Sequence, residues 1–454
     1  MIRSIDIKRN RILYPIQYLM GMLVHLGIEI IKPIIPKRYK ARLTEIEKSD
    51  FVMNVLGLTF FNAIGGVLVM ITNVKLANVL GASIFGIYSY YIAIGEVGSI
   101  FVRYGRHKTM TRDLIQNPPL FDSLISNTFI LGLLNILIFI SLTLIFSKPF
   151  NIDITLSTVL LMLAPCIGCV DFQPVYESIK LMSWHACYHL IQKIVFFGGI
   201  WCGILSFANP SLLYVSIILF VSWFITLIIQ YWEIIINLNI NIKKYVSIKT
   251  IVGLYKSNFL ISLSCLAGVA FGPVIQMVLK DYCDSTAVGI YAAGMQIFLL
   301  CQFFFNQIAR VGNPMMAEAG KDDCSIKYRK ALVTRYTIIM LVAALPFLIP
   351  LVFLPQITVD LFYTAEYAEL GALLPWFGLY LIGLALGIVY TQFLISLRKD
   401  KTYFAIYVTS AIATLVCTFT LIPEWGVLGA VISLCVPHTI GCVFYFIFSL
   451  KYLR

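Results

Sequence analysis

Charged residues are scarce in this sequence. Asp, Glu, Lys and Arg make up 12% of the 454 residues, about half of the share that soluble domains carry. Apolar residues make up 60% of the chain, and its mean hydropathy is +0.89. So little charge cannot cover a water-soluble fold of this size, and an all-α integral membrane protein is the class that remains.

Cysteine, glycine and proline are also too few to define a special class. The 11 Cys are spread over a long chain, and 29 Gly and 17 Pro are ordinary shares, which excludes disulfide scaffolds, collagen-like repeats and low-complexity chains. Cys166 and Cys169 form a C-x-x-C pair, but they lie in an apolar stretch with no second pair beside them. We therefore expect no metal site and no cofactor in this chain.

Long polar connections are missing too. Twelve apolar stretches have the length of about 20 residues that a helix needs to cross a bilayer, and no connection between them could hold a globular catalytic domain. Unbroken runs such as Leu212–Ile229 lack the alternation of barrel strands. The predicted spans are 52–72, 85–102, 122–146, 154–172, 186–206, 211–232, 257–279, 286–307, 331–354, 371–394, 403–422 and 426–449.

Basic residues mark one side of the predicted membrane protein. Apart from Lys75, Lys148, Lys280 and the mid-span Lys193, the Lys and Arg residues, 30 of 34, fall at the chain ends or in alternate connections. Because cytoplasmic segments retain positive charge, both termini are expected inside. The formal net charge of +12 then reflects topology and attraction to anionic lipids, and no nucleic-acid partner is expected.

The first fifty residues form a separate basic segment. Ile12–Ile31 is as long as a span but contains Gln17, His25 and Glu29. Basic residues flank it on both sides, and a thirteenth span would break the charge pattern. An amphipathic helix on the cytoplasmic face is the expected structure, with a spanning helix as the alternative.

A tripeptide recurs at the entry to two predicted spans. Gly86-Ile87-Tyr88 opens the second span, and Gly289-Ile290-Tyr291 opens the eighth, 203 positions later. The same offset carries the first span onto the seventh. A duplication follows, with an N-lobe at 51–232 and a C-lobe at 257–449, six spans in each. The basic segment 233–256 then links the lobes, and 1–50 and 450–454 are the cytoplasmic ends.

Four stretches together resemble one protein family. Residues 78–88 read Asn-Val-Leu-Gly-Ala-Ser-Ile-Phe-Gly-Ile-Tyr, and Gly289-Ile290-Tyr291-Ala292-Ala293 leads into Pro314. Leu361-Phe362 before Tyr367 and residues 422–430 follow along the chain. They look like the LG-x-x-x-FG-x-Y, Y-x-x-A, LF-x-x-x-Y and P-x-x-G-x-x-GA stretches of bacterial polysaccharide and O-antigen flippases (Wzx type). These belong to the MOP superfamily, which also contains MATE antiporters and lipid II flippases, and the resemblance covers residues 51 to 450.

The resemblance implies a fold, an activity and a location. Flippases of this family are two-lobed transporters of the bacterial inner membrane that alternate between inward and outward openings. They move an undecaprenyl-pyrophosphate-linked oligosaccharide to the periplasmic leaflet for surface polysaccharide biosynthesis, drawing on an ion gradient. The implied partners are this substrate, membrane lipids, and the polysaccharide polymerase and ligase machinery. No G-x-x-x-x-G-K-[ST] motif occurs, so ATP is not expected as the direct energy source.

The fifth predicted span carries basic side chains on one face. His185, His189 and Lys193 are spaced four residues apart, which stacks them along a helix. Lys193 lies well inside the span, where a charge usually faces the interior of the bundle. It is predicted to line a polar cavity and meet phosphate, unless it is paired structurally with Glu96 or Asp171. The two histidines are interpreted either as interfacial side chains or as ligands or proton carriers.

Two acidic residues are candidates for ion coupling. Glu96 is placed near a bilayer centre, where it could carry a coupling proton or cation or be neutralised by Lys193 or Arg103. Asp171, near the cytoplasmic end of the fourth span, is expected either at the interface or in coupling.

Amides and arginines supply a further set of candidates. Amides in a membrane can bond sugar hydroxyls, or they can join helices. Arginines at the cytoplasmic ends of helices can snorkel to the interface or capture a pyrophosphate. The candidates of this set are Gln302, Asn306 and Arg310 on the eighth span, Gln276 on the seventh, Asn62 on the first, and Arg103 after the second.

Two other functions remain open from the sequence. A MATE-like exporter of organic cations would need an acidic cavity, whereas the candidates here are mostly basic. A membrane enzyme acting on lipid-linked glycans would need acid, base or metal groups held by long outer loops. The outer loops are short, and Asp360, Glu366 and Glu369 in the longest are expected to form a solvated face. The sequence therefore favours a transporter over an enzyme.

Overall fold

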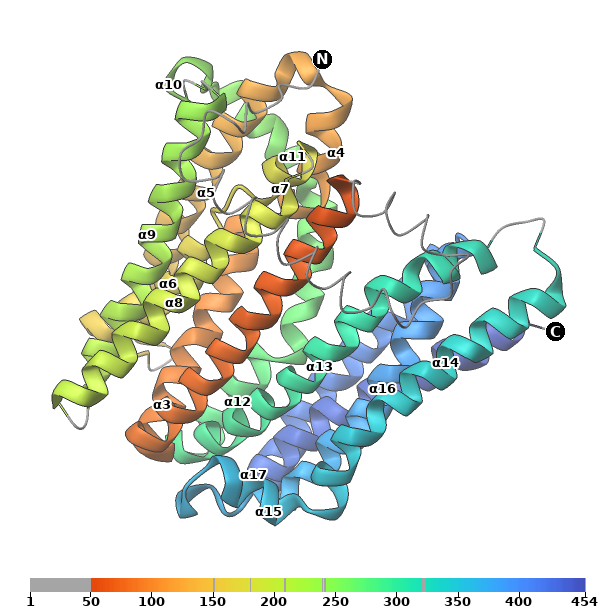
Figure 1. Ribbon diagram of the computed structural model, residues 1–454. Coiled ribbons are helices and arrows are strands. Elements are labelled where there is room, and N and C mark those ends of the chain that lie inside the picture. The colour runs from red at the N-terminus through yellow and green to blue at the C-terminus, as the bar shows by residue number, and fades with distance from the viewer. Residues whose placement is uncertain are drawn as a thin grey trace, which may run out of the picture. The chain divides into compact units, whose positions relative to one another are not determined.

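The computed structural model describes residues 50–149, 152–179, 181–207, 210–238, 240, 242–320 and 324–453. All regular secondary structure within these ranges is helical, as the composition predicts (Figure 1). The predicted interfacial helix Ile12–Ile31 lies outside the described residues, as does the rest of the predicted N-terminal segment up to residue 49.

The helices follow the predicted apolar stretches closely. Each of the twelve stretches lies mostly or wholly in helix. The elements are α3 (Asp50–Arg103), α4 (Arg106–Gln116), η2 (Pro118–Leu120), α5 (Phe121–Phe146), α6 (Leu156–Gly168), α7 (Gln173–Ser178), α8 (Met182–Phe207), α9 (Leu212–Leu238), α10 (Ile242–Tyr245), α11 (Ile248–Leu266), η3 (Ala267–Phe271), α12 (Pro273–Tyr282), α13 (Ser285–Ala319), α14 (Ile326–Leu348), η4 (Ile349–Phe353), α15 (Pro355–Phe362), η5 (Ala365–Tyr367), α16 (Leu370–Ser396) and α17 (Asp400–Leu450).

The number of membrane-crossing helices differs from the predicted twelve. Nine helices in the described ranges are long and apolar enough to cross a membrane, and a bent pair, Ile248–Phe259 with Ile261–Phe271, brings the number to ten. The difference arises because α3 contains two predicted spans, and α17 contains two more. Each of these helices is interrupted at a single glycine outside the helical conformation, Gly81 in α3 and Gly426 in α17.

Helix α17 folds back on itself at Gly426. A Cβ atom on Gly429 would lie 2.3 Å from the carbonyl oxygen of Leu421, and a Cβ atom on Gly441 would lie 2.2 Å from the hydroxyl oxygen of Ser410. The residues of each pair lie at similar distances on either side of the break. The two arms of α17 are therefore antiparallel, and each arm is long enough to cross a membrane by itself.

Hydrogen bonds to the end of α15 and the connection that follows it stabilise the break in α3. Gly81 has φ 73° and ψ 165°, a left-handed conformation that glycine adopts without steric cost. The backbone N–H of Ala82 donates to Glu366 Oε2 at 2.9 Å, and Asn78 Nδ2 donates to the carbonyl oxygen of Phe362 at 2.8 Å. Two of the stretches that carry the family resemblance therefore contact each other, and they hold the break in place.

Residue contacts divide the chain into two compact units. The first unit comprises the described residues up to Val69 together with Gly98–Trp201 and Ser216–Leu263. The second unit comprises Met70–Val97, Cys202–Val215 and Ser264–Arg454. Helix α3 contributes to both. The lobes 51–232 and 257–449, which follow the order of the chain, stay a prediction.

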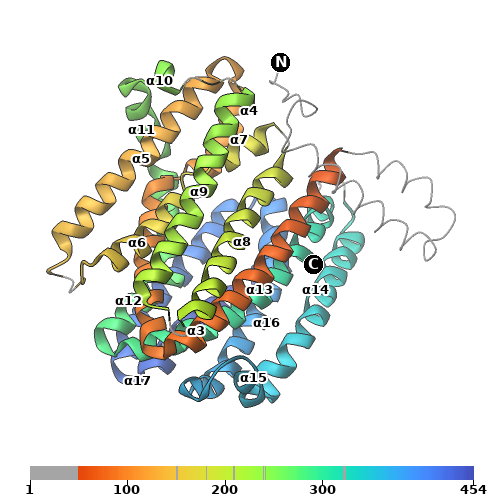
Figure 2. The ribbon, with the colours of Figure 1, turned by 60° about the vertical axis from the view of Figure 1, so that its left-hand side comes forward.

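The core of the first unit is rich in aromatic residues. Tyr176, Trp184 and Tyr188 are buried together with aliphatic side chains of α4, α5, α9 and α11. Helix α4 packs against α7, and α10 packs against α5 (Figure 2). Asn127 on α5 fastens the α10–α11 connection, because its amide donates to the carbonyl of Tyr245 at 2.9 Å. These contacts fix the end of the unit where α3 passes into α4.

The second unit is built around α16. This helix packs against α13, α14 and α17 (Figure 1), and most of its side chains are buried. Helix α15 and η4 pack against the same helix near its start. An apolar helix that is covered on nearly all sides is a core element, whereas a helix at the lipid boundary keeps one apolar face exposed.

Candidate functional site

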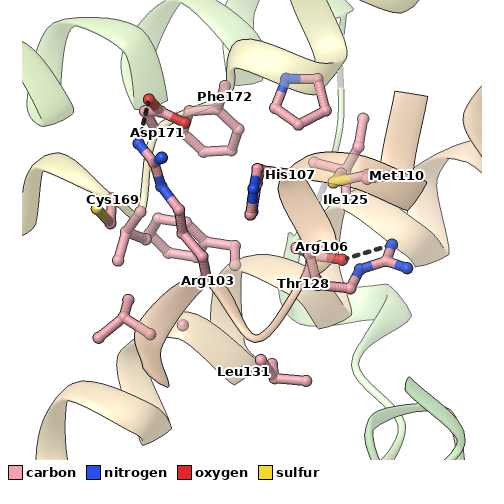
Figure 3. Close-up of a pocket in the computed structure, with 15 residues that line it drawn as sticks. Arg103, Arg106, His107, Met110, Ile125, Thr128, Leu131, Cys169, Asp171 and Phe172 are labelled. Atoms are coloured by element: carbon pink, nitrogen blue, oxygen red, sulfur yellow. Dashed lines mark hydrogen bonds and ion pairs between the residues drawn. The ribbon is translucent and has the colours of Figure 1, made fainter. Parts of the chain in front are cut away.

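A small cavity with charged residues in a mostly apolar wall lies in the first unit, where α3 ends. Its volume is about 40 Å³, and its walls come from α3, α4, α5 and the connection between α6 and α7. Figure 3 shows Arg103, Arg106 and His107 around the cavity, with Asp171 paired to Arg103. The polar and charged residues that line it are Arg103, Arg106, His107, Thr128 and Asp171.

The turn between α3 and α4 positions the two arginines. Tyr104 and Gly105 both have positive φ, 43° and 71°, so the chain changes direction within two residues. Gly105 also packs tightly, because a Cβ atom there would lie 3.1 Å from the backbone nitrogen of Ser262. Helix α3 ends at Arg103 and α4 begins at Arg106. Both arginines consequently line the same cavity.

Arg106 is buried in the wall of the cavity. Its side chain is 3% exposed, and its guanidinium donates to Thr128 Oγ1 at 3.2 Å and to Asp113 Oδ2 at 3.1 Å. Burial lowers the pKa of Arg106, and the negative charge of Asp113 opposes that shift. The guanidinium stays charged at any physiological pH. Arg106 therefore supplies a fixed positive charge beside the cavity.

Three basic side chains surround the carboxylate of Asp171. Asp171 lies in the break between α6 and α7, and its Oδ2 atom is 3.8 Å from a terminal nitrogen of Arg103. The same atom is 3.4 Å from His185 Nε2 and 3.6 Å from His189 Nε2. The Nε2 atoms of the two histidines are 3.0 Å apart. The four-residue spacing on α8 thus brings both imidazoles to one carboxylate.

Lys193, one helical turn further along α8, lies against a different neighbour. Its side chain crosses Gly65 of α3, since a Cβ atom on Gly65 would lie 2.6 Å from Lys193 Cδ and 2.8 Å from Nζ. Lys193 is half-buried. Asp171, which the sequence offers as one structural partner for this lysine, is engaged by Arg103 and the histidines instead.

Among the predicted residues, Arg103 and Asp171 line the cavity, whereas His185, His189 and Lys193 of α8 do not. The remaining candidates do not line it either. Asn62 is half-buried on the part of α3 that belongs to the first unit. The others belong to the second unit. Among them, Glu96 and Asn306 are exposed, Gln276 and Gln302 are half-buried, and the side chain of Arg310 lies outside what the structure describes. Within the described part of the chain, Gln276 Oε1 is buried without a hydrogen-bond partner.

Sequence reasoning missed several buried polar groups of the first unit. Arg106 is predicted only as a basic loop residue, although the glycine before it signals a chain reversal. Glu233 is 8% exposed and accepts a hydrogen bond from the hydroxyl of Tyr176 at 2.5 Å. Gln192 donates to Ser222 Oγ at 2.9 Å, and the signal for it is an amide in the middle of an apolar helix.

Known proteins match this chain in sequence. Residues 51–320 match the family model described as polysaccharide biosynthesis protein. The capsular polysaccharide biosynthesis protein CapF of Staphylococcus aureus is 23% identical over 286 residues, which are 60% of this chain and 67% of CapF.

Solved structures share the fold. The lipid II flippase MurJ in an inward closed conformation superposes with a TM-score of 0.69 at 14% identity, over 87% of each chain. An inward-facing MATE multidrug resistance transporter of the MOP superfamily has a TM-score of 0.57 at 11% identity, over 87% of this chain and 94% of that one. At these identities the likeness concerns the fold alone. The chain is therefore an all-helical, multi-span membrane protein with a MurJ- and MATE-like fold, and it belongs to the polysaccharide biosynthesis protein family.

Proposed function

We propose that this protein is a flippase that moves an undecaprenyl-pyrophosphate-linked oligosaccharide repeat unit from the cytoplasmic to the periplasmic leaflet. Its family membership gives the context of polysaccharide biosynthesis, and its fold is that of transporters. The observation that carries the proposal is the set of cationic side chains, Arg103 and Arg106, around a cavity of the first unit. Transport proceeds by alternating access and is coupled to an ion gradient.

Electrostatics supports this choice of substrate. A pyrophosphate cannot enter hydrocarbon without cationic or hydrogen-bonding partners. Arg103 is 33% exposed and lies 3.8 Å from Asp171, so it can turn from the carboxylate to an incoming phosphate. The cavity is far smaller than a lipid-linked oligosaccharide, so it receives only the pyrophosphate end, and it opens further during transport.

Other residues have proposed parts in the same pathway. On α8, Lys193, His189 and His185 extend the basic surface inward from Arg103. Amide groups bond sugar hydroxyls, and acidic groups couple transport to an ion. The proposed amide and arginine contacts are Asn62, Gln276, Gln302, Asn306 and Arg310, and the candidates for ion coupling are Glu96 and Asp171.

We infer twelve membrane crossings with both termini in the cytoplasm of a bacterium, across its inner membrane. Basic residues gather at one end of the second unit: Arg329 donates to the carbonyl of Ala319 at 2.8 Å, which joins α14 to the end of α13. Lys399, after α16, lies 5.2 Å from the ring of Tyr452 near the C-terminus. Positive charge favours the cytoplasmic side. The proposed division is an N-lobe at 51–232, a linker at 233–256 and a C-lobe at 257–449, with 1–50 and 450–454 in the cytoplasm.

Two rival functions fit the observed contacts less well. A MATE-like exporter of organic cations would face the positive charges of Arg103 and Arg106 in this cavity. An enzyme acting on lipid-linked glycans would draw on the carboxylates of α15 and of the connection from α15 to α16, but Glu366 accepts a hydrogen bond from Ala82 and Asp360 accepts one from Gln356. We therefore assign the chemistry on lipid-linked glycans to separate proteins, and we propose the polymerase and ligase of polysaccharide assembly as partners of this protein.

Complementation tests the proposed function. The gene is deleted in its native host, surface polysaccharide and lipid-linked repeat units are measured, and variants are expressed at matched membrane levels. We expect the deletion to remove surface polysaccharide while repeat units accumulate in the cytoplasmic leaflet. Wild type restores transport, whereas Arg103→Ala and Lys193→Ala do not. The matched control is Arg112→Ala, because Arg112 lies on α4 but is exposed and does not line the cavity.

Two outcomes of this experiment would favour another function over the flippase. Normal polysaccharide in the deletion strain, with altered resistance to cationic compounds, would indicate a MATE-like exporter. Absence of the lipid-linked repeat units themselves would indicate an enzyme that makes them.

A further inference from the structure

Three side chains that can bind a metal converge beside the cavity. Asp171, His185 and His189 each offer one ligand atom, and these atoms lie within 4.8 Å of one another. The Nε2 atoms are 3.0 Å apart, and they lie 3.4 and 3.6 Å from Asp171 Oδ2. The Asp171 and His185 side chains are each 11% exposed. The ligand atoms therefore face one another in an interior site.

The spacing of the ligand atoms fits a tetrahedral ion. Zinc bonds of about 2.0–2.1 Å to nitrogen and oxygen, at tetrahedral angles, place neighbouring ligand atoms about 3.3 Å apart. The three observed separations average about 3.3 Å. An octahedral ion with bonds of the same length would bring neighbouring ligand atoms to about 2.9 Å. Three protein ligands with one open position is a common arrangement for zinc.

Hydrogen bonds alone hold this cluster loosely. The contact between the two Nε2 atoms uses the proton of one neutral imidazole and the lone pair of the other. Asp171 Oδ2 is shielded from solvent, and its three basic neighbours lie 3.4–3.8 Å away, longer than a well-formed hydrogen bond. A cation that binds all three atoms satisfies the carboxylate oxygen and both imidazole lone pairs at once.

The ligands come from one helix and from the connection between two others. His185 and His189 stand at the i, i+4 spacing that lets one helix supply two imidazoles to a metal. Asp171 comes from the four residues between α6 and α7. The His189 ring packs edge-on against Trp223 at 5.4 Å, which screens the site, whereas Asp171 also lines the cavity and gives an ion a polar approach.

Arg103 is the positive group that a bound cation would face. Its terminal nitrogen lies 3.8 Å from Asp171 Oδ2, and its side chain is 33% exposed. Because the guanidinium is partly in solvent, it can move away from the carboxylate when a metal binds. It can also pair with an anion that occupies the open position of the metal.

We propose that Asp171, His185 and His189 bind a divalent transition-metal ion of the zinc class, with water or an oxygen of a bound anion as the fourth ligand. This replaces the expectation of no metal site, and the ligands are not the cysteines of the C-x-x-C pair. The ion fastens the α6–α7 connection to α8. With Asp171 held by the metal, Glu96 is left as the candidate for ion coupling.

Metal binding by the purified full-length protein tests this site. The protein is stripped with a chelator in detergent, and Zn²⁺ affinity is measured by competition with a chromophoric chelator. Co²⁺ then reports the geometry, because tetrahedral Co²⁺ absorbs visible light more strongly than octahedral Co²⁺. The variants are His185→Gln, His189→Gln and the isosteric Asp171→Asn. The matched controls are His107→Gln beside the cavity, His438→Gln in the second unit, and Cys169→Ser.

We expect one Zn²⁺ per wild-type chain and a tetrahedral Co²⁺ spectrum. Each ligand variant should weaken binding by roughly 100-fold or more, while the three controls keep the wild-type affinity. Zn²⁺ should raise the Tm of the wild type and the controls more than that of the ligand variants. Equal affinity of wild type and Asp171→Asn, or no binding by the folded wild type, would overturn the proposal. Since transport is not the readout, failure of the metal site would leave the flippase proposal standing, whereas a confirmed site would remove Asp171 from the candidates for ion coupling.

Discussion

Gly86 of α3 packs against the backbone of α13, and Gly289 of α13 packs against the backbone of α3. A Cβ atom on Gly86 would lie 1.7 Å from the carbonyl oxygen of Ser285, and a Cβ atom on Gly289 would lie 2.0 Å from the carbonyl oxygen of Ala82. Ala82 and Ser285, like the two glycines, are 203 positions apart, so each contact maps onto the other. The two Gly-Ile-Tyr copies are therefore related by a local two-fold axis, which supports the internal duplication.

Replacing either glycine by alanine is expected to destabilise the protein. The added methyl group would meet backbone oxygen, which cannot rotate away as a side chain can, so α3 and α13 must separate. Such overpacking costs about 1–3 kcal/mol. The measurement is the Tm of purified Gly86→Ala and Gly289→Ala proteins. Gly198→Ala on α8 is the control, because nothing lies within 4 Å of its Cβ position, and equal Tm values for all three would contradict the prediction.

Removing the Glu366 carboxylate is expected to destabilise the protein at the break in α3. The backbone N–H of Ala82, directly after Gly81, donates to Glu366 Oε2 at 2.9 Å, as the first turn of a helix does to a capping side chain. Removing such a cap costs about 1 kcal/mol. Glu366→Ala should therefore lower the Tm of the purified protein, whereas Glu369→Ala, at an exposed side chain nearby, should not. An unchanged Tm for Glu366→Ala would mean that the cap adds no stability.

Helix positions are predictable from this sequence, but the continuity of the helices is not. Length and apolarity alone decide where a chain can cross a membrane, which is why the twelve stretches fall in helix. Gly81 and Gly426 each interrupt a helix by one residue. Hydropathy separates the spans on either side of each glycine, but it does not show that a single residue joins them without a loop. The contact of Gly441 with Ser410 in the folded-back α17 joins residues that are far apart in the sequence. A local sequence pattern therefore does not predict it.

Arg106 is expected to contribute more stability than its exposed neighbour. Its buried guanidinium bonds Thr128 and Asp113, and hydrogen bonds to charged groups are worth roughly 1.5–3 kcal/mol. Arg106→Ala should lower the free energy of unfolding by about that amount. Arg106→Lys should recover only part of it, because an ammonium cannot reproduce the fork of the guanidinium. Arg112→Ala is the control, since an exposed ion pair contributes less than about 1 kcal/mol. Similar losses for Arg106→Ala and Arg112→Ala, measured by thermal or chemical unfolding, would refute this role.

The candidate site is less predictable than the helices that carry it. Helical spacing alone brings His185 and His189 together. Asp171 reaches them only because the chain leaves α6 after Gly168 and turns before α7. The predicted span ends close to this turn, at residue 172, but its length and apolarity do not show where the Asp171 side chain lies. The burial of Arg106 depends on Thr128 of α5, a tertiary contact with no signal in the local sequence.

Gly65→Ala is expected to impair transport only while Lys193 is present. The added methyl would lie 2.6 Å from Lys193 Cδ and 2.8 Å from Nζ, so the ammonium must leave its place against α3. If Lys193 meets the substrate from this place, loss of one charge-assisted hydrogen bond of roughly 1.5–3 kcal/mol lowers the transport rate by about 10- to 100-fold. The measurement is complementation, together with accumulation of lipid-linked repeat units.

The double variant Gly65→Ala/Lys193→Ala shows whether Gly65 acts on transport through Lys193 or independently of it. With Lys193→Ala already in place, Gly65→Ala has no side chain to displace, so it should add no further loss of transport. An additive loss would mean that Gly65 acts separately, through the packing of α3 on its other neighbours. Gly198→Ala again controls for the added methyl, because its Cβ position is open. Full transport by Lys193→Ala would remove this lysine from the pathway and leave the phosphate contact to Arg103 and Arg106.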